Sequence, residues 1–301
     1  MPSLTENPVA RSLQRRVGLA LRSKVAGDDA PERAERIWGA EGERWFTPED
    51  PVWRVNADAA MFPGGIAALL LQSLHPLAMA GVAGHSGYQG DPWGRLQRTS
   101  LYLATTTFGT VADAEQIIAV VRSVHRTVRG TDHRGRAYAA DDPHLLRWVH
   151  VAEVRSFLSA FQAYAAKPLT PQEADLYVRQ ANVAAELLGA TDLPTTVAEL
   201  DEVVRDYRPE LESTPAAREA TRFMLLNPPV PLVARPGYAL IAAGGVALLP
   251  AWARRSLMLP VVGPGVRLAS GAGSLSTALV RWGMAGLEER KPADGPLPEA
   301  S

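Results

Sequence analysis

An uncharged segment of 32 residues, from position 59 to position 90, constrains the fold of this chain more than any other feature. Leaving it in water would forfeit roughly 25 cal/mol for each Å² of apolar surface, so it must be buried in protein or in lipid. Gln72, the dipeptide His75-Pro76 and His85 interrupt the segment. Polar groups buried with it need partners, because an unpaired one costs about 1–3 kcal/mol. A buried histidine there predicts either a satisfied core network or the wall of a functional site.

The length of this segment also raises the question of a membrane span, since about 20 consecutive apolar residues cross a bilayer. Pro63 and Pro76 lie inside it, and a second apolar stretch, residues 236–253, contains Gly244 and Gly245. We therefore expect buried helices punctuated by proline, with the uncharged segment broken at His75-Pro76, rather than helices that span a membrane.

The overall composition predicts a folded core and excludes several classes of function. Hydrophobic residues make up 47% of the 301 residues, which favours a substantial core over disorder. Lys plus Arg is 31 against Asp plus Glu 32, and this balance does not favour a nucleic-acid partner. The absence of cysteine excludes disulfides, Cys-type zinc sites, iron–sulfur clusters and thiolate-ligated haem.

The N-terminal segment carries basic residues, including Arg11, Arg15 and Arg16, but no continuous apolar stretch. It therefore does not resemble a secretory signal, and we expect a cytoplasmic protein. A basic amphipathic helix that contacts a membrane surface remains an alternative to a solvated helix there.

Nearly all hydrophobic periodicity in the chain is helical. Asp91-Pro92, Asp142-Pro143 and Thr170-Pro171 each place a capping side chain before a proline suited to the first helical position. The sequence predicts one all-α domain, and strand patterns are nearly absent. The expected helices cover residues 9–26, 31–44, 64–84, 92–107, 112–129, 143–166, 171–189, 196–211, 215–226, 237–248, 251–258 and 272–287. The expected organisation is an N-terminal helical extension (1–50), a helical domain (51–262), a C-terminal helix packed on it (263–287) and a disordered tail (288–301).

His125 is the first candidate for chemistry. Ile118, Val121 and Val128 lie at i−7, i−4 and i+3 from it, so His125 falls on the apolar face of an amphipathic helix. Taken alone, this position is more typical of a satisfied core histidine than of a ligand.

Arg95, Arg98 and Thr99 share one helical face, and Tyr102 lies one turn further along. Two guanidinium groups and a hydroxyl on one face could hold carboxylates or polarise a bound oxygen species. A solvated face or a buried ion-pair network is the alternative. The segment that contains Tyr138 and His150 fits either a pocket wall or ordinary capping and packing.

These residues together resemble the family of MpaB-type oxygenases, which includes the latex-clearing rubber oxygenases. The pattern runs through Leu71-Gln72-Ser73-Leu74-His75-Pro76, Asp91-Pro92, Arg95-Leu96-Gln97-Arg98-Thr99, Phe108-Gly109-Thr110, His125-Arg126-Thr127-Val128-Arg129-Gly130, Tyr138, Asp142-Pro143 and Trp148-Val149-His150. The resemblance covers roughly residues 50 to 260.

The resemblance implies an all-helical fold with a globin-like core and a b-type haem. His125 would be the proximal ligand of the haem iron, with Arg95 and Thr99 on the distal side. Arg98 falls where rubber oxygenases place a lysine, and it stays protonated because the pKa of its guanidinium remains above about 12. Rubber oxygenases carry an acid–base glutamate upstream of the arginine motif, whereas this chain has no acidic residue between positions 59 and 90.

We therefore expect a haem b-dependent oxygenase that uses dioxygen on a small apolar substrate, an unsaturated isoprenoid or lipid-like molecule rather than rubber. Arg95, Arg98 and Thr99 are the expected catalytic residues. His75, Tyr138 and His150 are candidates for acid–base chemistry by their side-chain type alone. Two alternatives stay open: a haem-binding sensor or carrier without turnover, and a metal-free helical protein that binds lipid.

Overall fold

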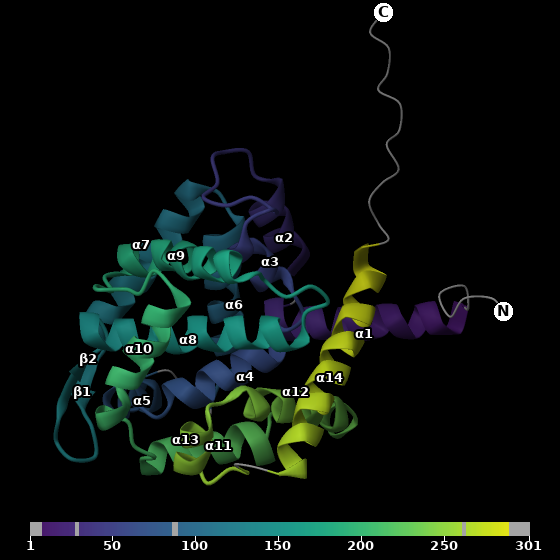
Figure 1. Ribbon diagram of the computed structural model, residues 1–301. Coiled ribbons are helices and arrows are strands. Elements are labelled where there is room, and N and C mark those ends of the chain that lie inside the picture. The colour runs from purple at the N-terminus through teal and green to yellow at the C-terminus, as the bar shows by residue number, and fades with distance from the viewer. Residues whose placement is uncertain (1–7, 28–29, 86–89, 261–262, 289–301) are drawn as a thin grey trace, which may run out of the picture.

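Helices form most of the chain in the computed structural model, which describes residues 8–27, 30–85, 90–260 and 263–288 (Figure 1). The predicted all-α fold is confirmed, because strand is limited in these ranges to one short hairpin. The α-helices are α1 (Pro8–Ala26), α2 (Ala30–Gly39), α3 (Pro51–Ala57), α4 (Met61–Gln72), α5 (Pro76–His85), α6 (Pro92–Phe108), α7 (Val111–Thr127), α8 (Pro143–Tyr164), α9 (Pro171–Leu188), α10 (Val197–Asp206), α11 (Pro215–Leu226), α12 (Arg235–Leu248), α13 (Ala251–Ser256) and α14 (Pro264–Glu288). The remaining elements are the strands β1 (Arg129–Thr131) and β2 (Ala137–Ala139) and the 3₁₀ helices η2 (Arg208–Glu210) and η3 (Leu232–Ala234).

The proline-punctuated helix starts lie where the sequence predicts them. The carboxylates of Asp91 and Asp142 accept hydrogen bonds from backbone N–H groups in the first turns of α6 and α8. Thr170 and Glu173 form a reciprocal capping box at the start of α9. These caps satisfy backbone donors that a helix start otherwise leaves without partners.

The uncharged segment folds as two helices, α4 and α5, bent by 108° at the break between them. Pro76 lacks the backbone N–H that would continue α4, and its ring disfavours a helical conformation at His75. Leu74 and His75, at the break, are buried. Within the described residues no single helix is long and apolar enough to cross a membrane, and the bent pair meets the length and composition criteria only when taken together.

The core is built on the contact between α4 and α8, which lie side by side in the middle of the molecule (Figure 1). Leu70 and Leu71 of α4 and Trp148 and Val151 of α8 are almost completely buried. The indole N–H of Trp148 donates a hydrogen bond to the carbonyl of Gln72 at 3.2 Å. This bond supplies a partner for a backbone group at the end of α4, close to the bend.

Three local features differ from the sequence prediction. Helix α3 was not predicted, and the segment after His125 contains the antiparallel hairpin of β1 and β2 rather than a plain loop. Each strand is only three residues long, too short for an alternating pattern to be detected. Helix α14 begins at Pro264, eight residues before the predicted start at position 272, and the predicted disordered tail lies beyond the described residues apart from Glu288.

Helix α14 crosses α12 and α1 at one side of the molecule (Figure 1). At the α12–α14 crossing a Cβ on Gly244 would lie 2.6 Å from the Cα of Gly273, so the two backbones touch without a side chain between them. The hydroxyl of Tyr164 donates to the carbonyl of Gly244 at 3.0 Å beside this contact. Glycine is therefore required here by close approach of the helices.

We predict that Gly273→Ala destabilises the protein by about 1–3 kcal/mol, because the new methyl group would collide with Gly244 and the Tyr164 ring. The control is Gly271→Ala in the same helix, where nothing lies within 4 Å of an added Cβ. That change should be neutral or stabilise by up to about 1 kcal/mol through helix propensity. Urea unfolding followed by circular dichroism measures both, and equal effects of the two substitutions would contradict the packing argument.

Candidate functional site

His125 lies in the last turn of α7, at its C-terminal end. Its side chain is half-buried, and its Nδ1 atom is buried without a hydrogen-bond partner. Burial lowers the pKa of the imidazole, and the nearby negative charge of Asp141 offsets this only in part. His125 therefore presents a neutral imidazole, which is the form that ligates metal ions.

Arg95, Arg98 and Thr99 lie in the first half of α6, as the sequence predicts. Arg98 is exposed and forms a 3.3 Å ion pair with Asp91, which is also exposed. The hydroxyl of Thr99 donates to the carbonyl of Arg95 in its own helix at 3.1 Å. The hydroxyl oxygen of Thr99 therefore still offers an acceptor, but its proton is used within the helix.

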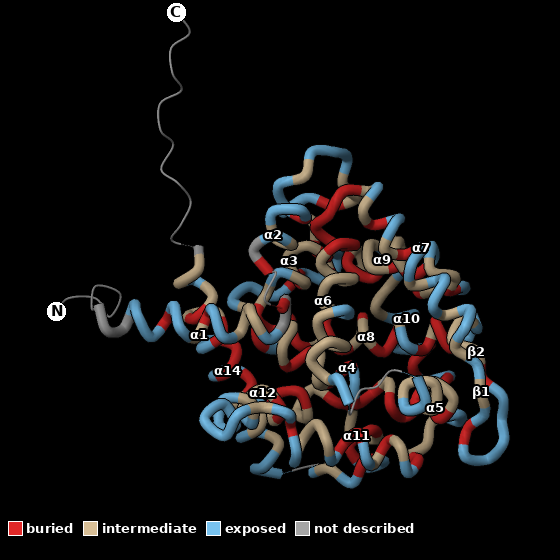
Figure 2. The backbone as a smooth tube through the Cα atoms, turned by 180° about the vertical axis from the view of Figure 1, so that it is seen from behind, coloured by how far each residue is buried: buried red, intermediate tan, exposed pale blue. Residues whose placement is uncertain are grey.

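Helix α6 changes character along its length. None of residues 92–104 is buried, whereas residues 105–108 all are, and Figure 2 shows α6 largely in the colour of intermediate exposure. The helix packs mainly against α7, α1 and α3. The half of α6 that carries the arginine motif is thus incompletely covered by protein.

Glu153 of α8 is a residue that sequence reasoning missed. Burial raises the pKa of its carboxyl group to about 7. Its charge also raises the pKa of Tyr102 on α6 and that of Tyr177 on α9, in each case after burial as the larger cause. Tyr102 continues the helical face of Arg95 and Thr99, so Glu153 approaches that face from α8. The sequence signal was His150-Val151-Ala152-Glu153, which places the histidine and the carboxylate one helical turn apart in an apolar helix.

The other candidates lie in separate places. The Nε2 atom of His150 is 2.9 Å from the side-chain oxygen of Asn182, whose amide donates to the carbonyl of Pro194. Burial lowers the pKa of His150 to about 4, so it is neutral near pH 7. Tyr138, the middle residue of β2, is buried against α5, with its hydroxyl 3.3 Å from Nδ1 of His85.

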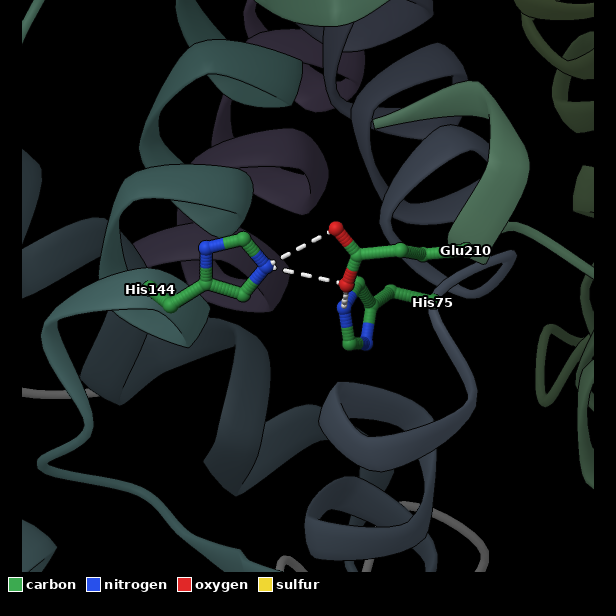
Figure 3. A group of neighbouring side chains, drawn as sticks. All are labelled: His75, His144 and Glu210. Atoms are coloured by element: carbon green, nitrogen blue, oxygen red, sulfur yellow. Dashed lines mark hydrogen bonds and ion pairs between the residues drawn. The ribbon is translucent and has the colours of Figure 1, made fainter. Parts of the chain in front are cut away.

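His75 belongs to a second cluster, which the sequence did not predict. Its imidazole lies at the α4–α5 break and faces His144 of α8 and Glu210 of η2 (Figure 3). One ligand-type atom from each of the three residues lies within 4.8 Å of those of the other two. His144 and Glu210 could not be found from the sequence, because they are far apart in the chain and share no motif.

Comparison with known families shows to which family this chain belongs. The family model described as "ER-bound oxygenase mpaB/B'/Rubber oxygenase, catalytic domain" matches residues 53–282. The chain belongs to this family. A search of curated proteins and a search of solved structures each gave no significant match. The matched region of the mpaB/rubber oxygenase family contains His125, the arginine motif, Glu153 and the His75 cluster, and it is the catalytic domain of an oxygenase.

The buried ionisable groups predict opposite pH dependences of stability. His150 has a folded-state pKa of about 4 against 6.5 for the free side chain, so its contribution is lost as the pH falls from about 6.5 to 4. Glu153 has a folded-state pKa of about 7 against 4.5, so its contribution is lost as the pH rises from about 4.5 to 7.

We therefore expect Glu153→Gln to be more stable than the wild type at pH 7.5, by about 1–3 kcal/mol, and closer to it at pH 5. Urea unfolding over this pH range measures the difference. Glu202→Gln on the exposed side of α10 is the matched control and should run parallel to the wild type. Parallel curves for Glu153→Gln would show that Glu153 does not titrate in a buried environment.

Proposed function

We propose that this protein is a haem b-dependent oxygenase that uses dioxygen to oxidise an apolar, unsaturated substrate, with His125 as the protein ligand of the iron. The family supports the oxygenase activity. The observation that carries the haem assignment is the buried Nδ1 of His125, which has no hydrogen-bond partner among the described residues. A buried polar atom without a partner is costly unless a ligand completes it.

The residues present fit a histidine-ligated haem. The chain has no cysteine and six histidines. His75 and His144 face Glu210, His150 is held by Asn182, and His85 and His133 are exposed. This leaves His125 as the half-buried imidazole that no other side chain engages through a hydrogen bond.

A bound haem would supply the one-electron and dioxygen chemistry that no side chain of this protein can perform. The protein's own part is to position and to move protons. The guanidinium groups of Arg95 and Arg98 provide positive charge on α6, which suits haem carboxylates or a developing negative charge on oxygen. The acceptor oxygen of Thr99 lies on the same helical face.

We assign the acid–base role to Glu153. A carboxyl group with a pKa of about 7 can both donate and accept a proton near neutral pH, which is the optimum for general acid–base catalysis. It comes from α8 rather than from the uncharged segment that precedes the arginine motif. The absence of a carboxylate from positions 59–90 is thus compatible with turnover.

The surface beside Glu153 suits an apolar substrate. Val149, one turn before Glu153 on α8, is 37% exposed although α8 is the central helix, and Leu69 of α4 is 38% exposed. The side chain of Gln72, one turn after Leu69, donates to the carbonyl of Val149 at 3.0 Å, so these faces of α4 and α8 adjoin. Exposed leucine and valine beside a carboxyl group whose pKa is raised by burial favour an isoprenoid or lipid-like alkene over a charged substrate.

The haem assignment predicts that protein produced with haem supply shows a Soret absorption band that His125→Ala loses or strongly shifts. His133→Ala, at an exposed turn, is the matched control and should keep the wild-type spectrum. A wild type without a Soret band would contradict haem binding. A band unchanged in His125→Ala would contradict this ligand while leaving haem binding intact.

The acid–base assignment predicts that Glu153→Gln lowers kcat for oxygen consumption with an unsaturated isoprenoid substrate by about 10²–10⁴-fold. The Soret band should be retained, because Glu153 is not a ligand. Glu202→Gln should keep the wild-type kcat. If Glu153→Gln has the wild-type kcat and pH profile, another group transfers the proton. A stable oxygen complex without consumption on a panel of such substrates would instead favour a sensor or carrier.

A further inference from the structure

Three side chains from distant parts of the chain converge at the α4–α5 break (Figure 3). His75 lies at the break itself, His144 in the first turn of α8, and Glu210 at the end of η2. In Figure 3 both imidazole rings turn toward the Glu210 carboxylate. His75 is 1% exposed, whereas His144 and Glu210 reach solvent, so one side of the cluster is closed and the other is open.

The spacing of the three groups is close to that of ligands around one metal ion. The Oε2 atom of Glu210 is 2.9 Å from Nε2 of His144 and 3.4 Å from Nε2 of His75. Ligand atoms bound tetrahedrally at about 2.0–2.1 Å from zinc lie about 3.3 Å from one another. A small adjustment of the exposed Glu210 and His144 side chains would therefore accommodate the ion.

The hydrogen bonds around His144 favour the neutral tautomer in which Nε2 carries no proton and faces the Glu210 carboxylate. The hydroxyl of Tyr207 donates its single proton to the backbone carbonyl of His144 at 2.8 Å. The same hydroxyl oxygen is 3.3 Å from Nδ1 of His144, and this contact is favourable when Nδ1 carries a proton. In the neutral ring the lone pair of Nε2 then points at a carboxylate oxygen 2.9 Å away. Two acceptors at that distance need a proton or a metal ion between them.

His75 supplies an independent second observation. Its Nε2 atom is buried and makes no hydrogen bond, although it is aimed at Glu210. The backbone N–H of Ala78 donates a hydrogen bond to Nδ1 at 3.4 Å, which is longer than usual. The tautomer with its proton on Nδ1 loses this one long bond and frees Nε2 for a metal ion.

We infer that His75, His144 and Glu210 form a binding site for a divalent transition-metal ion of the borderline class that includes Zn²⁺. Two imidazoles and a carboxylate are the donors that zinc prefers, and water can occupy the fourth position on the open side. The bound ion joins the α4–α5 break to the start of α8 and to η2. The positive charge of Arg136, which is paired with Asp132 and Glu212, lowers the pKa of His75, so the carboxylate of Glu210 is needed to hold a cation there.

This site is independent of the haem assignment, since no residue is shared with it. The test uses the full chain freed of metal by chelator and titrated with ZnCl₂ by calorimetry and by thermal unfolding. We expect near one-to-one binding and a rise in Tm of several degrees, because an ion that binds only the folded state stabilises it. Glu210→Gln and His144→Gln should each weaken Zn²⁺ binding at least tenfold and remove most of the Tm shift.

His133→Gln, an exposed histidine outside the cluster, is the matched control and should bind Zn²⁺ as the wild type does. Because His144 and Glu210 are exposed, their variants should keep the wild-type circular dichroism spectrum, which separates loss of a ligand from misfolding. Co²⁺ provides a second readout through visible d–d bands that both variants should lose. No saturable Zn²⁺ binding, or binding unchanged in Glu210→Gln, would overturn the inference and would show that a proton alone bridges His144 and Glu210.

Discussion

The burial of an uncharged helix against α8 is the constraint on which the rest of this structure depends. Helix α4 has no charge to place in solvent, and its leucines pack on Trp148 and its neighbours. At the end of α4 the chain changes direction by 108°, because Pro76 cannot continue the helix. The Trp148 hydrogen bond to the Gln72 carbonyl satisfies one of the backbone groups that the bend exposes. Glu153 of α8 and the cluster of His75, His144 and Glu210 both lie at this α4–α8 layer.

The sequence predicted the features that local physics determines. Proline after a capping residue marks helix starts, and the break at His75-Pro76 follows from the geometry of proline alone. It did not predict contacts made between distant segments. Glu210 lies 66 residues from His144 and carries no motif, so only the fold brings the two together. Glu153 was overlooked because the sequence does not show that Tyr102 of α6 and Tyr177 of α9 lie near its carboxyl group.

The electrostatics of the interior follow from the same packing. His75, His125 and His150 have their pKa values lowered by burial, whereas that of Glu153 is raised, so burial shifts each of these groups toward its neutral form. A neutral interior costs little desolvation energy and leaves imidazoles free to ligate. The globin-like core, the cytoplasmic location and membrane contact through the basic N-terminal helix stay predictions.

The close contact between Gly244 of α12 and Gly273 of α14 also bears on where the chain can be truncated without loss of stability. Arg281 of α14 donates to both carboxylate oxygens of Asp58 and to the carbonyl of Tyr164, so the last helix closes a loop of more than two hundred residues. A chain cut at position 262 would expose the glycine face of α12 to water and would leave the partly buried Asp58 without its cation. We therefore expect the helical domain and its C-terminal helix to fold as one unit.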